Sequence, residues 1–224
     1  MDIKYFSGHK REINFCAVSP DCQILLTCSD DSKIYIWNVK TGQLICKVKG
    51  HTAPVKACMF SPDCILFASC DENCTARVWK TSTAECLHIL KGHSKIVETV
   101  CFSPDSRQLL TGGWDCTAIL WDVQSGHHMK TFYGHESAIQ CSAFAPNGQY
   151  LATGSWDYTV KIWDLLKEGK EKTLNGHRGN ISCVSFSKLG MLVSLKLSLG
   201  IREDGRCGFF TFVNIKWLPV TLYI

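Results

Sequence analysis

The chain of 224 residues lacks apolar periodicity of the helical kind, so no segment predicts an amphipathic helix. It also lacks a large charge of one sign, because the net charge is +4 and no basic run stands out. This balance gives no indication of nucleic-acid binding. Residues 1–6 contain no apolar stretch long enough for a signal peptide, and we therefore expect a cytoplasmic or nuclear protein that is not secreted.

The chain also has little that would place it in a membrane. The apolar stretch 207–224 is barely long enough for a spanning helix, and it contains Asn214, Lys216 and Pro219. We therefore expect no membrane association. An extra strand, or an aggregation-prone tail, is the preferred interpretation of this stretch.

Fourteen cysteines raise the alternatives of a disulfide scaffold or a zinc site, but no Cys-x-x-Cys pair is present. Several cysteines recur 42 residues apart, as Cys16 and Cys58 or Cys22 and Cys64 do. Equivalent positions in successive repeats face the same way and do not meet. We therefore expect small buried side chains or exposed thiols in a reducing compartment, with no metal and no cofactor.

A period of 42 residues runs through most of the chain. Each period opens with a Gly-His dipeptide, and a tryptophan follows 28 residues after each of the first four histidines. A fixed period of this length is typical of repeat proteins, in which no single unit can bury its own apolar face. The histidines are His9, His51, His93, His135 and His177, and the tryptophans are Trp37, Trp79, Trp121 and Trp163.

The third period shows what each repeat folds into. Four short runs rich in β-branched and aromatic residues cover 96–102, 108–113, 117–121 and 128–132. Segments with proline, aspartate, serine or glycine separate them and predict turns. The pattern therefore predicts four antiparallel strands per repeat and an all-β fold.

Polar residues recur inside the period as well. A serine or threonine lies ten residues before each tryptophan, and an aspartate or asparagine lies six before it. Because buried polar groups need partners, these side chains predict a hydrogen-bonded tetrad running from indole to hydroxyl, hydroxyl to imidazole and imidazole to carboxylate. The hydroxyl residues are Thr27, Ser69, Thr111 and Thr153, and the acid or amide residues are Asp31, Asn73, Asp115 and Asp157.

With these offsets and the dipeptides Trp121-Asp122 and Trp163-Asp164, residues 1–194 resemble the WD-repeat (WD40-type) family. The resemblance implies a β-propeller of radial four-stranded blades around a channel, with repeats starting near residues 8, 50, 92, 134 and 176. It further implies that the fourth strand of one period joins the next three in one blade. Because family rings usually close with about seven blades, four complete repeats and a partial fifth predict an incomplete or open propeller.

The resemblance also locates a rim for protein binding. Strand alternation turns the residue five after each histidine toward the channel, and in the family the residue before each acid or amide reaches the same rim. Acidic residues on this rim suit a basic peptide, and tryptophans there suit a binding hot spot. The alternative interpretation is that the tryptophans pack against neighbouring loops. The rim candidates are Asn14, Lys56, Glu98 and Gln140 on the strands and Asp30, Glu72, Trp114 and Trp156 in the turns.

Three functions follow from these patterns. The family implies a non-catalytic scaffold or adaptor that binds peptides or domains on the top face of the propeller. Hydroxyl, histidine and aspartate together also suggest a hydrolase triad, but the set recurs in four periods with a tryptophan each time. No Gly-x-Ser-x-Gly elbow or phosphate loop is present, and we therefore do not expect an enzyme.

The repeat pattern fails after Ser194, and Gly205 stands where the next tryptophan is due. Residues 195–224 are interpreted as a non-repeat apolar tail. The hypothesis that follows is a truncated isoform, and a fragment with no independent function is the alternative to the scaffold.

Overall fold

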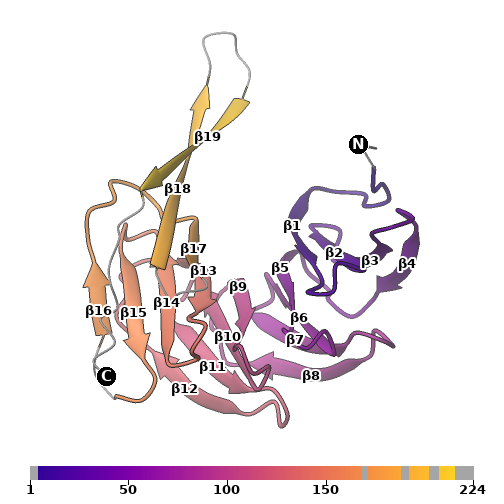
Figure 1. Ribbon diagram of the computed structural model, residues 1–224, viewed down its shortest axis with the longest axis horizontal. Coiled ribbons are helices and arrows are strands. Elements are labelled where there is room, and N and C mark those ends of the chain that lie inside the picture. The colour runs from indigo at the N-terminus through magenta and orange to yellow at the C-terminus, as the bar shows by residue number, and fades with distance from the viewer. Residues whose placement is uncertain (1–4, 168–170, 188–191, 202–206, 215–224) are drawn as a thin grey trace.

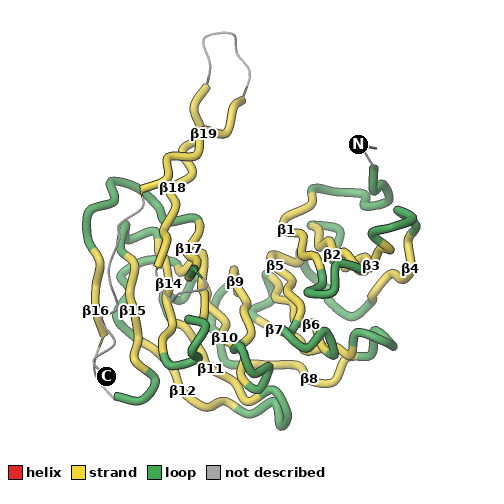
Figure 2. The backbone as a smooth tube through the Cα atoms, viewed as in Figure 1, coloured by secondary structure: helices red, strands yellow, loops and turns green. Residues whose placement is uncertain are grey.

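The computed structural model describes residues 5–167, 171–187, 192–201 and 207–214. Strands and loops account for all of these ranges, and none of the described residues is helical (Figure 2). No described segment forms a helix that is long and apolar enough to cross a membrane. The predicted all-β class is confirmed.

Four sheets contain four strands each. The first has β1 (Ile13–Val18), β2 (Ile24–Ser29), β3 (Ile34–Asn38) and β4 (Leu44–Val48). The second has β5 (Val55–Phe60), β6 (Leu66–Asp71), β7 (Thr75–Lys80) and β8 (Cys86–Lys91). The third has β9 (Val97–Phe102), β10 (Gln108–Gly113), β11 (Ala118–Asp122) and β12 (His128–Phe132). The fourth has β13 (Ile139–Phe144), β14 (Tyr150–Ser155), β15 (Val160–Asp164) and β16 (Glu171–Leu174).

A fifth sheet has three strands, β17 (Cys183–Phe186), β18 (Leu192–Ile201) and β19 (Cys207–Asn214). Strand β18 runs through Ser194, where the repeat pattern ends, and pairs with β17 on one side and β19 on the other. The interpretation of 207–224 as an extra strand therefore corresponds to β19 over 207–214. Residues 215–224 lie outside the described part of the chain, and the domain boundary at 194 stays a prediction.

Strands are paired in the order in which they occur along the chain, as antiparallel meanders. All four strands of one period therefore lie in one sheet, with β9, β10, β11 and β12 as neighbours. The expectation that the fourth strand joins the following period is wrong. Short turns join each strand to the next, so pairing along the sequence costs the least chain entropy.

The turn between the first two strands of a blade is held by its own side chains. Ser103 Oγ donates to Asp105 Oδ1 at 2.6 Å and accepts from the Gln108 amide at 2.8 Å. Asp105 Oδ1 also accepts from the Arg107 amide. The same contacts recur at Ser19 and Ser61, and they explain why serine and aspartate flank the proline of this turn.

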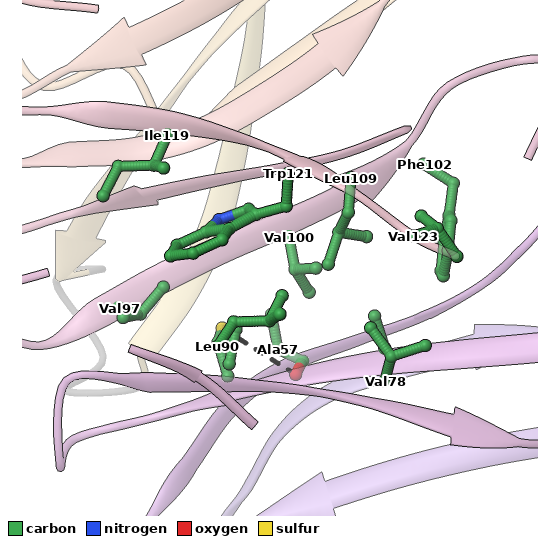
Figure 3. Close-up of a cluster of buried hydrophobic side chains, with 13 residues drawn as sticks. Ala57, Val78, Leu90, Val97, Val100, Phe102, Leu109, Ile119, Trp121 and Val123 are labelled. Carbon is green, nitrogen blue, oxygen red and sulfur yellow. Dashed lines mark hydrogen bonds between the residues drawn. The ribbon is translucent and has the colours of Figure 1, made fainter. Parts of the chain in front are cut away.

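Apolar side chains fill the space between neighbouring blades. Figure 3 shows Trp121, Leu109 and Val100 of the third blade facing Val78 and Leu90 of the second. Comparable clusters join the first blade to the second, the third to the fourth, and the fourth to the fifth. Each blade is therefore apolar on both faces and depends on its neighbours for burial.

The blades follow an arc whose two ends do not meet (Figure 1). Strands β1, β5, β9, β13 and β17 lie on the concave side, as the innermost strands of a propeller do. The predicted incomplete propeller is confirmed in this form.

No blade within the described ranges packs against the leading face of the first blade, which is the face that the preceding blade covers in the other four, and side-chain exposure shows this. Ile13 opens β1 and is 50% exposed, whereas its equivalents Val55, Val97, Ile139 and Ile181 are 0% exposed. Val18, at the other end of β1, is 54% exposed, while the equivalent Phe60 is 5% exposed. The leading face of the other blades is covered because the preceding blade packs against it.

Two substitutions of the same side chain test this arrangement. Ile139→Ala should lower the free energy of unfolding by about 2–5 kcal/mol, because it leaves a cavity between blades. Ile13→Ala should cost less than about 1 kcal/mol, because half of that side chain already meets water. Urea denaturation measures both. Equal losses would show that the first blade is covered in solution and would contradict the open arc.

Candidate functional site

The third blade shows the polar tetrad in full. Trp121 Nε1 donates to Thr111 Oγ1 at 2.9 Å, and His93 Nε2 lies 2.8 Å from the same hydroxyl. His93 Nδ1 lies 2.9 Å from Asp115 Oδ2. One assignment of protons satisfies every atom: the hydroxyl donates to Nε2, and Nδ1 donates to the carboxylate.

The first and fourth blades repeat this chain of contacts. In the first, Thr27 Oγ1 lies 2.8 Å from Trp37 Nε1 and 2.8 Å from His9 Nε2, and His9 Nδ1 lies 3.0 Å from Asp31. In the fourth, Thr153 Oγ1 lies 3.0 Å from Trp163 Nε1 and 2.7 Å from His135 Nε2, and His135 Nδ1 lies 2.7 Å from Asp157. The structure therefore brings these twelve predicted side chains together in three tetrads.

The second blade corrects one prediction. His51 Nε2 lies 2.6 Å from Ser69 and Trp79 donates to Ser69, but His51 Nδ1 lies 2.6 Å from Asp71. The predicted member Asn73 is exposed and donates to Thr52 Oγ1 instead.

Chemistry explains why Asp71 displaces Asn73. A carboxylate accepts a hydrogen bond from an imidazole N–H more strongly than an amide does. The equivalents of Asp71 in the other blades are Ser29, Gly113 and Ser155, so only this blade has an acid two residues before the expected one. That anomaly in the repeat is the signal by which the sequence identifies Asp71.

In the first three blades the tetrad indole lies close to the glycine that precedes the histidine. A Cβ at Gly92 would approach Trp121 Cη2 to 2.9 Å, and one at Gly50 would approach Trp79 Cη2 to 2.7 Å. Real Cβ atoms do not come that close to rigid rings, so the Gly-His dipeptide and the tryptophan depend on each other.

Burial controls the protonation of the tetrads. It lowers the pKa of His51 and His135 below 6.5, although the carboxylates of Asp71 and Asp157 oppose the shift. Burial alone would raise the pKa of Asp115, but hydrogen bonds from His93 and the Ser94 amide outweigh it and lower that pKa to about 2. The native state therefore favours neutral imidazole at these two positions and ionised aspartate.

The tetrads stabilise the fold and are poorly suited to nucleophilic chemistry. The hydroxyl residues Ser69, Thr111 and Thr153 are 0% exposed, and each hydroxyl lies between an indole and an imidazole. A nucleophile must reach its substrate, and these hydroxyl groups have no access to one.

The rim candidates form four pairs, one in each complete blade. A residue on the innermost strand contacts a residue 16 positions later, in the turn after the second strand. The pairs are Asn14 with Asp30 at 2.7 Å, Lys56 with Glu72 at 2.7 Å, Glu98 with Trp114 at 3.1 Å and Gln140 with Trp156 at 2.5 Å.

The direction of donation changes along the rim. In the first two pairs the strand residue donates and the acid in the turn accepts. In the last two the indole N–H of the turn donates to Glu98 or Gln140 on the strand. The rim therefore changes from acidic turns in the first two blades to aromatic turns in the next two.

Charge is concentrated where the acidic half of the rim meets the aromatic half. Lys56 Nζ also lies 3.7 Å from Asp30, and although burial opposes it, the neighbouring acids raise the pKa of Lys56. Burial raises the pKa of Glu98, and the negative charge of Glu72 adds to that shift. Glu98 is thus a half-buried carboxylate beside a lysine that is bonded to another acid.

The two rim tryptophans contact each other across neighbouring blades. Their ring centroids lie 5.2 Å apart at an interplanar angle of 54°. Trp114 is 37% exposed and Trp156 is half-buried. The two rings thus pack against each other while part of Trp114 stays exposed, and the interpretation as a binding hot spot remains a prediction.

Thirteen cysteines, from Cys16 to Cys183, have free thiols. The described ranges contain no group of three or more metal-ligating side chains. Burial raises the pKa of Cys101 to about 12, which keeps that thiol protonated and unreactive.

Known proteins share the repeat. A sequence profile for a family described as the IFT122 first beta-propeller matches residues 12–198. WD repeat-containing protein 38 is 48% identical over 46 residues in Mus musculus and 51% identical over 46 residues in Homo sapiens, in each case 20% of this chain and 15% of the relative. Apoptotic protease-activating factor 1 of Danio rerio is 43% identical over 37 residues, 16% of this chain and 3% of the relative. The chain thus matches a small part of each relative's length.

Substitutions in the second blade test the assignment of Asp71. Asp71→Asn should lower the free energy of unfolding by about 1–3 kcal/mol, because it replaces a buried charged acceptor opposite His51. Asn73→Ala should change it by no more than about 0.5 kcal/mol, as is usual for an exposed side chain. Urea denaturation distinguishes them. A larger loss for Asn73→Ala would restore Asn73 to the tetrad.

Acid should destabilise the protein before its carboxylates titrate. Because the folded pKa of His51 and His135 lies below the unfolded value of 6.5, the unfolded chain binds more protons as the pH falls. The stabilisation that His51 and His135 contribute is complete above pH 6.5 and is lost as the pH falls toward their pKa in the folded state. Urea denaturation at about pH 7.5 and pH 5.5 should show this loss, and His51→Gln should reduce it. Stability that stays flat or rises on acidification would contradict the neutral tetrads.

Proposed function

Because the chain belongs to the family described as the IFT122 first beta-propeller, and so to the WD-repeat propellers, we propose that it is a non-catalytic scaffold. It binds protein or peptide partners through the rim of its inner strands. The observation that carries this proposal is the set of four strand-to-turn pairs, and above all the exposed Trp114 beside Trp156.

The packing of the blades does not account for this tryptophan pair, in which Trp114 is exposed and Trp156 is half-buried. The tetrad tryptophans already supply the packing of each blade, and the equivalents of Trp114 in the first two blades are Asp30 and Glu72. The fold therefore does not require an indole in this turn. Tryptophan is among the residues most enriched at binding hot spots, because it buries a large rigid surface and keeps one hydrogen bond.

The chemistry of the rim favours proteins over nucleic acid. Its four pairs contain three carboxylates and one ammonium group, which would repel a phosphate backbone. A cytoplasmic or nuclear location is part of the proposal, and the free thiols support a reducing compartment. The buried tetrad hydroxyls support the absence of catalysis at those residues.

Peptide display tests the proposal directly. Random peptides would be selected on the immobilised chain, and the affinity of the selected peptides would be measured by calorimetry. Trp156→Ala should weaken them by about thirtyfold, as loss of a hot-spot residue does, and should leave the melting temperature nearly unchanged.

Met129→Ala is the matched control, because Met129 is 48% exposed on the outer strand β12. Peptides that bind wild type and Trp156→Ala equally well would contradict the proposal. A large loss of stability in Trp156→Ala would show that this side chain serves packing. A folded chain that selects no specific peptide would favour the alternative of a fragment without an independent function.

A further inference from the structure

Glu98 lies where the acidic and aromatic halves of the rim meet. Its Oε2 accepts from Trp114 Nε1 at 3.1 Å, and within the described part of the chain its Oε1 receives no hydrogen bond. The nearby ammonium group of Lys56 is committed elsewhere, at 2.7 Å from Glu72 and 3.7 Å from Asp30. The charge of Glu98 is therefore not cancelled by a direct ion pair.

The indole of Trp114 is oriented by the same hydrogen bond. Since its N–H points to Glu98, the edge of the ring is fixed next to the carboxylate, and 37% of the residue remains exposed. Trp156 is held in the same way by Gln140 and lies with its ring centroid 5.2 Å from that of Trp114. A negative charge and two electron-rich rings thus adjoin one another on the rim.

We propose that Glu98, Trp114 and Trp156 bind the guanidinium group of an arginine in a basic segment of a protein partner. The proposal rests on the proposed function and specifies its partner. A carboxylate and an indole face both attract a cation, and they do so more strongly where water is partly excluded. Three carboxylates against one ammonium group in the four pairs give the rim the complementary sign for such a segment.

Arginine suits this arrangement better than lysine. The guanidinium group is planar, so it stacks on an indole and donates two parallel hydrogen bonds to one carboxylate. An ammonium group makes no such stacked contact and is more strongly hydrated. An apolar side chain would use the rings but would leave the half-buried carboxylate of Glu98 without a cation.

Nuclear magnetic resonance titration tests the site without an identified partner. The probe is N-acetyl-arginine N-methylamide, and the control ligand is its citrulline analogue, which has nearly the same shape and no charge. The arginine probe should shift the indole N–H resonances of Trp114 and Trp156, and it should leave those of the buried Trp121 and Trp163 in place. The citrulline analogue should bind at least about tenfold more weakly.

Two variants of equal charge complete the test. Glu98→Gln should weaken the arginine probe by about tenfold, since it removes the charged acceptor. Glu85→Gln changes the net charge by the same amount in the exposed turn between β7 and β8, and it should leave the affinity unchanged. Circular dichroism melting curves would show that both variants are folded.

The outcomes separate this proposal from the proposed function. Equal affinity for the arginine and citrulline probes, or equal loss in Glu98→Gln and Glu85→Gln, would overturn the arginine site. If displayed peptides still required Trp156 in that case, the rim would remain a protein-binding surface with a partner of different chemistry. If the arginine site failed and the displayed peptides also bound Trp156→Ala as tightly as wild type, the scaffold proposal would be overturned as well.

Discussion

A buried indole N–H that must find an acceptor is the constraint on which every complete blade depends. In each one the acceptor is a serine or threonine hydroxyl on the second strand, which also contacts the histidine of the loop before the first strand. The histidine in turn contacts an aspartate, which ends the second strand in the second blade and lies in the turn after that strand in the other three. One chain of hydrogen bonds thus connects the loop before the first strand with the end of the second. The rim turn residue is the sequence neighbour of this anchored aspartate in all four complete blades, preceding it in three and following it in the second. The network that stabilises the blade thus also gives the proposed binding surface a rigid base.

Stacking between blades is the second requirement, because each sheet is apolar on both faces. Ile13 is half exposed whereas its equivalents in the other blades are fully buried, so a blade face without a neighbouring blade leaves apolar side chains in contact with water. An arc of blades still keeps the inner strands side by side, so the rim pairs of neighbouring blades remain adjacent (Figure 1). The contact between Trp114 and Trp156 depends on this adjacency, since it joins the third blade to the fourth. The proposed binding through the rim would therefore require the stacked arc rather than any single blade.

Much of the fold could be predicted from the period. The runs 108–113 and 128–132 coincide with β10 and β12, because turn residues such as proline, aspartate, serine and glycine precede each run. The period assigns roles by spacing, and spacing alone does not decide which of two nearby polar side chains contacts the histidine, as with Asp71 at the end of β6 and Asn73 in the next turn. The resemblance implied the wrong sheet for the fourth strand of each repeat, because it overlooked that a short turn favours pairing with the third strand just before it. The rim residues were identified, but their pairing at a spacing of 16 residues, and the reversed direction of donation at Trp114 and Trp156, required the structure.

The central claim is that tryptophan serves two distinct roles in this chain, one in the tetrads and one on the rim. Hydrogen exchange of the indole N–H groups, followed by nuclear magnetic resonance, tests it most directly. The account predicts slow exchange at Trp37, Trp79, Trp121 and Trp163, where a buried hydroxyl accepts the bond, and fast exchange at Trp114 and Trp156 near the surface. Tetrad indoles that exchange as fast as the rim indoles would contradict it, because the network would then not be closed to water in solution.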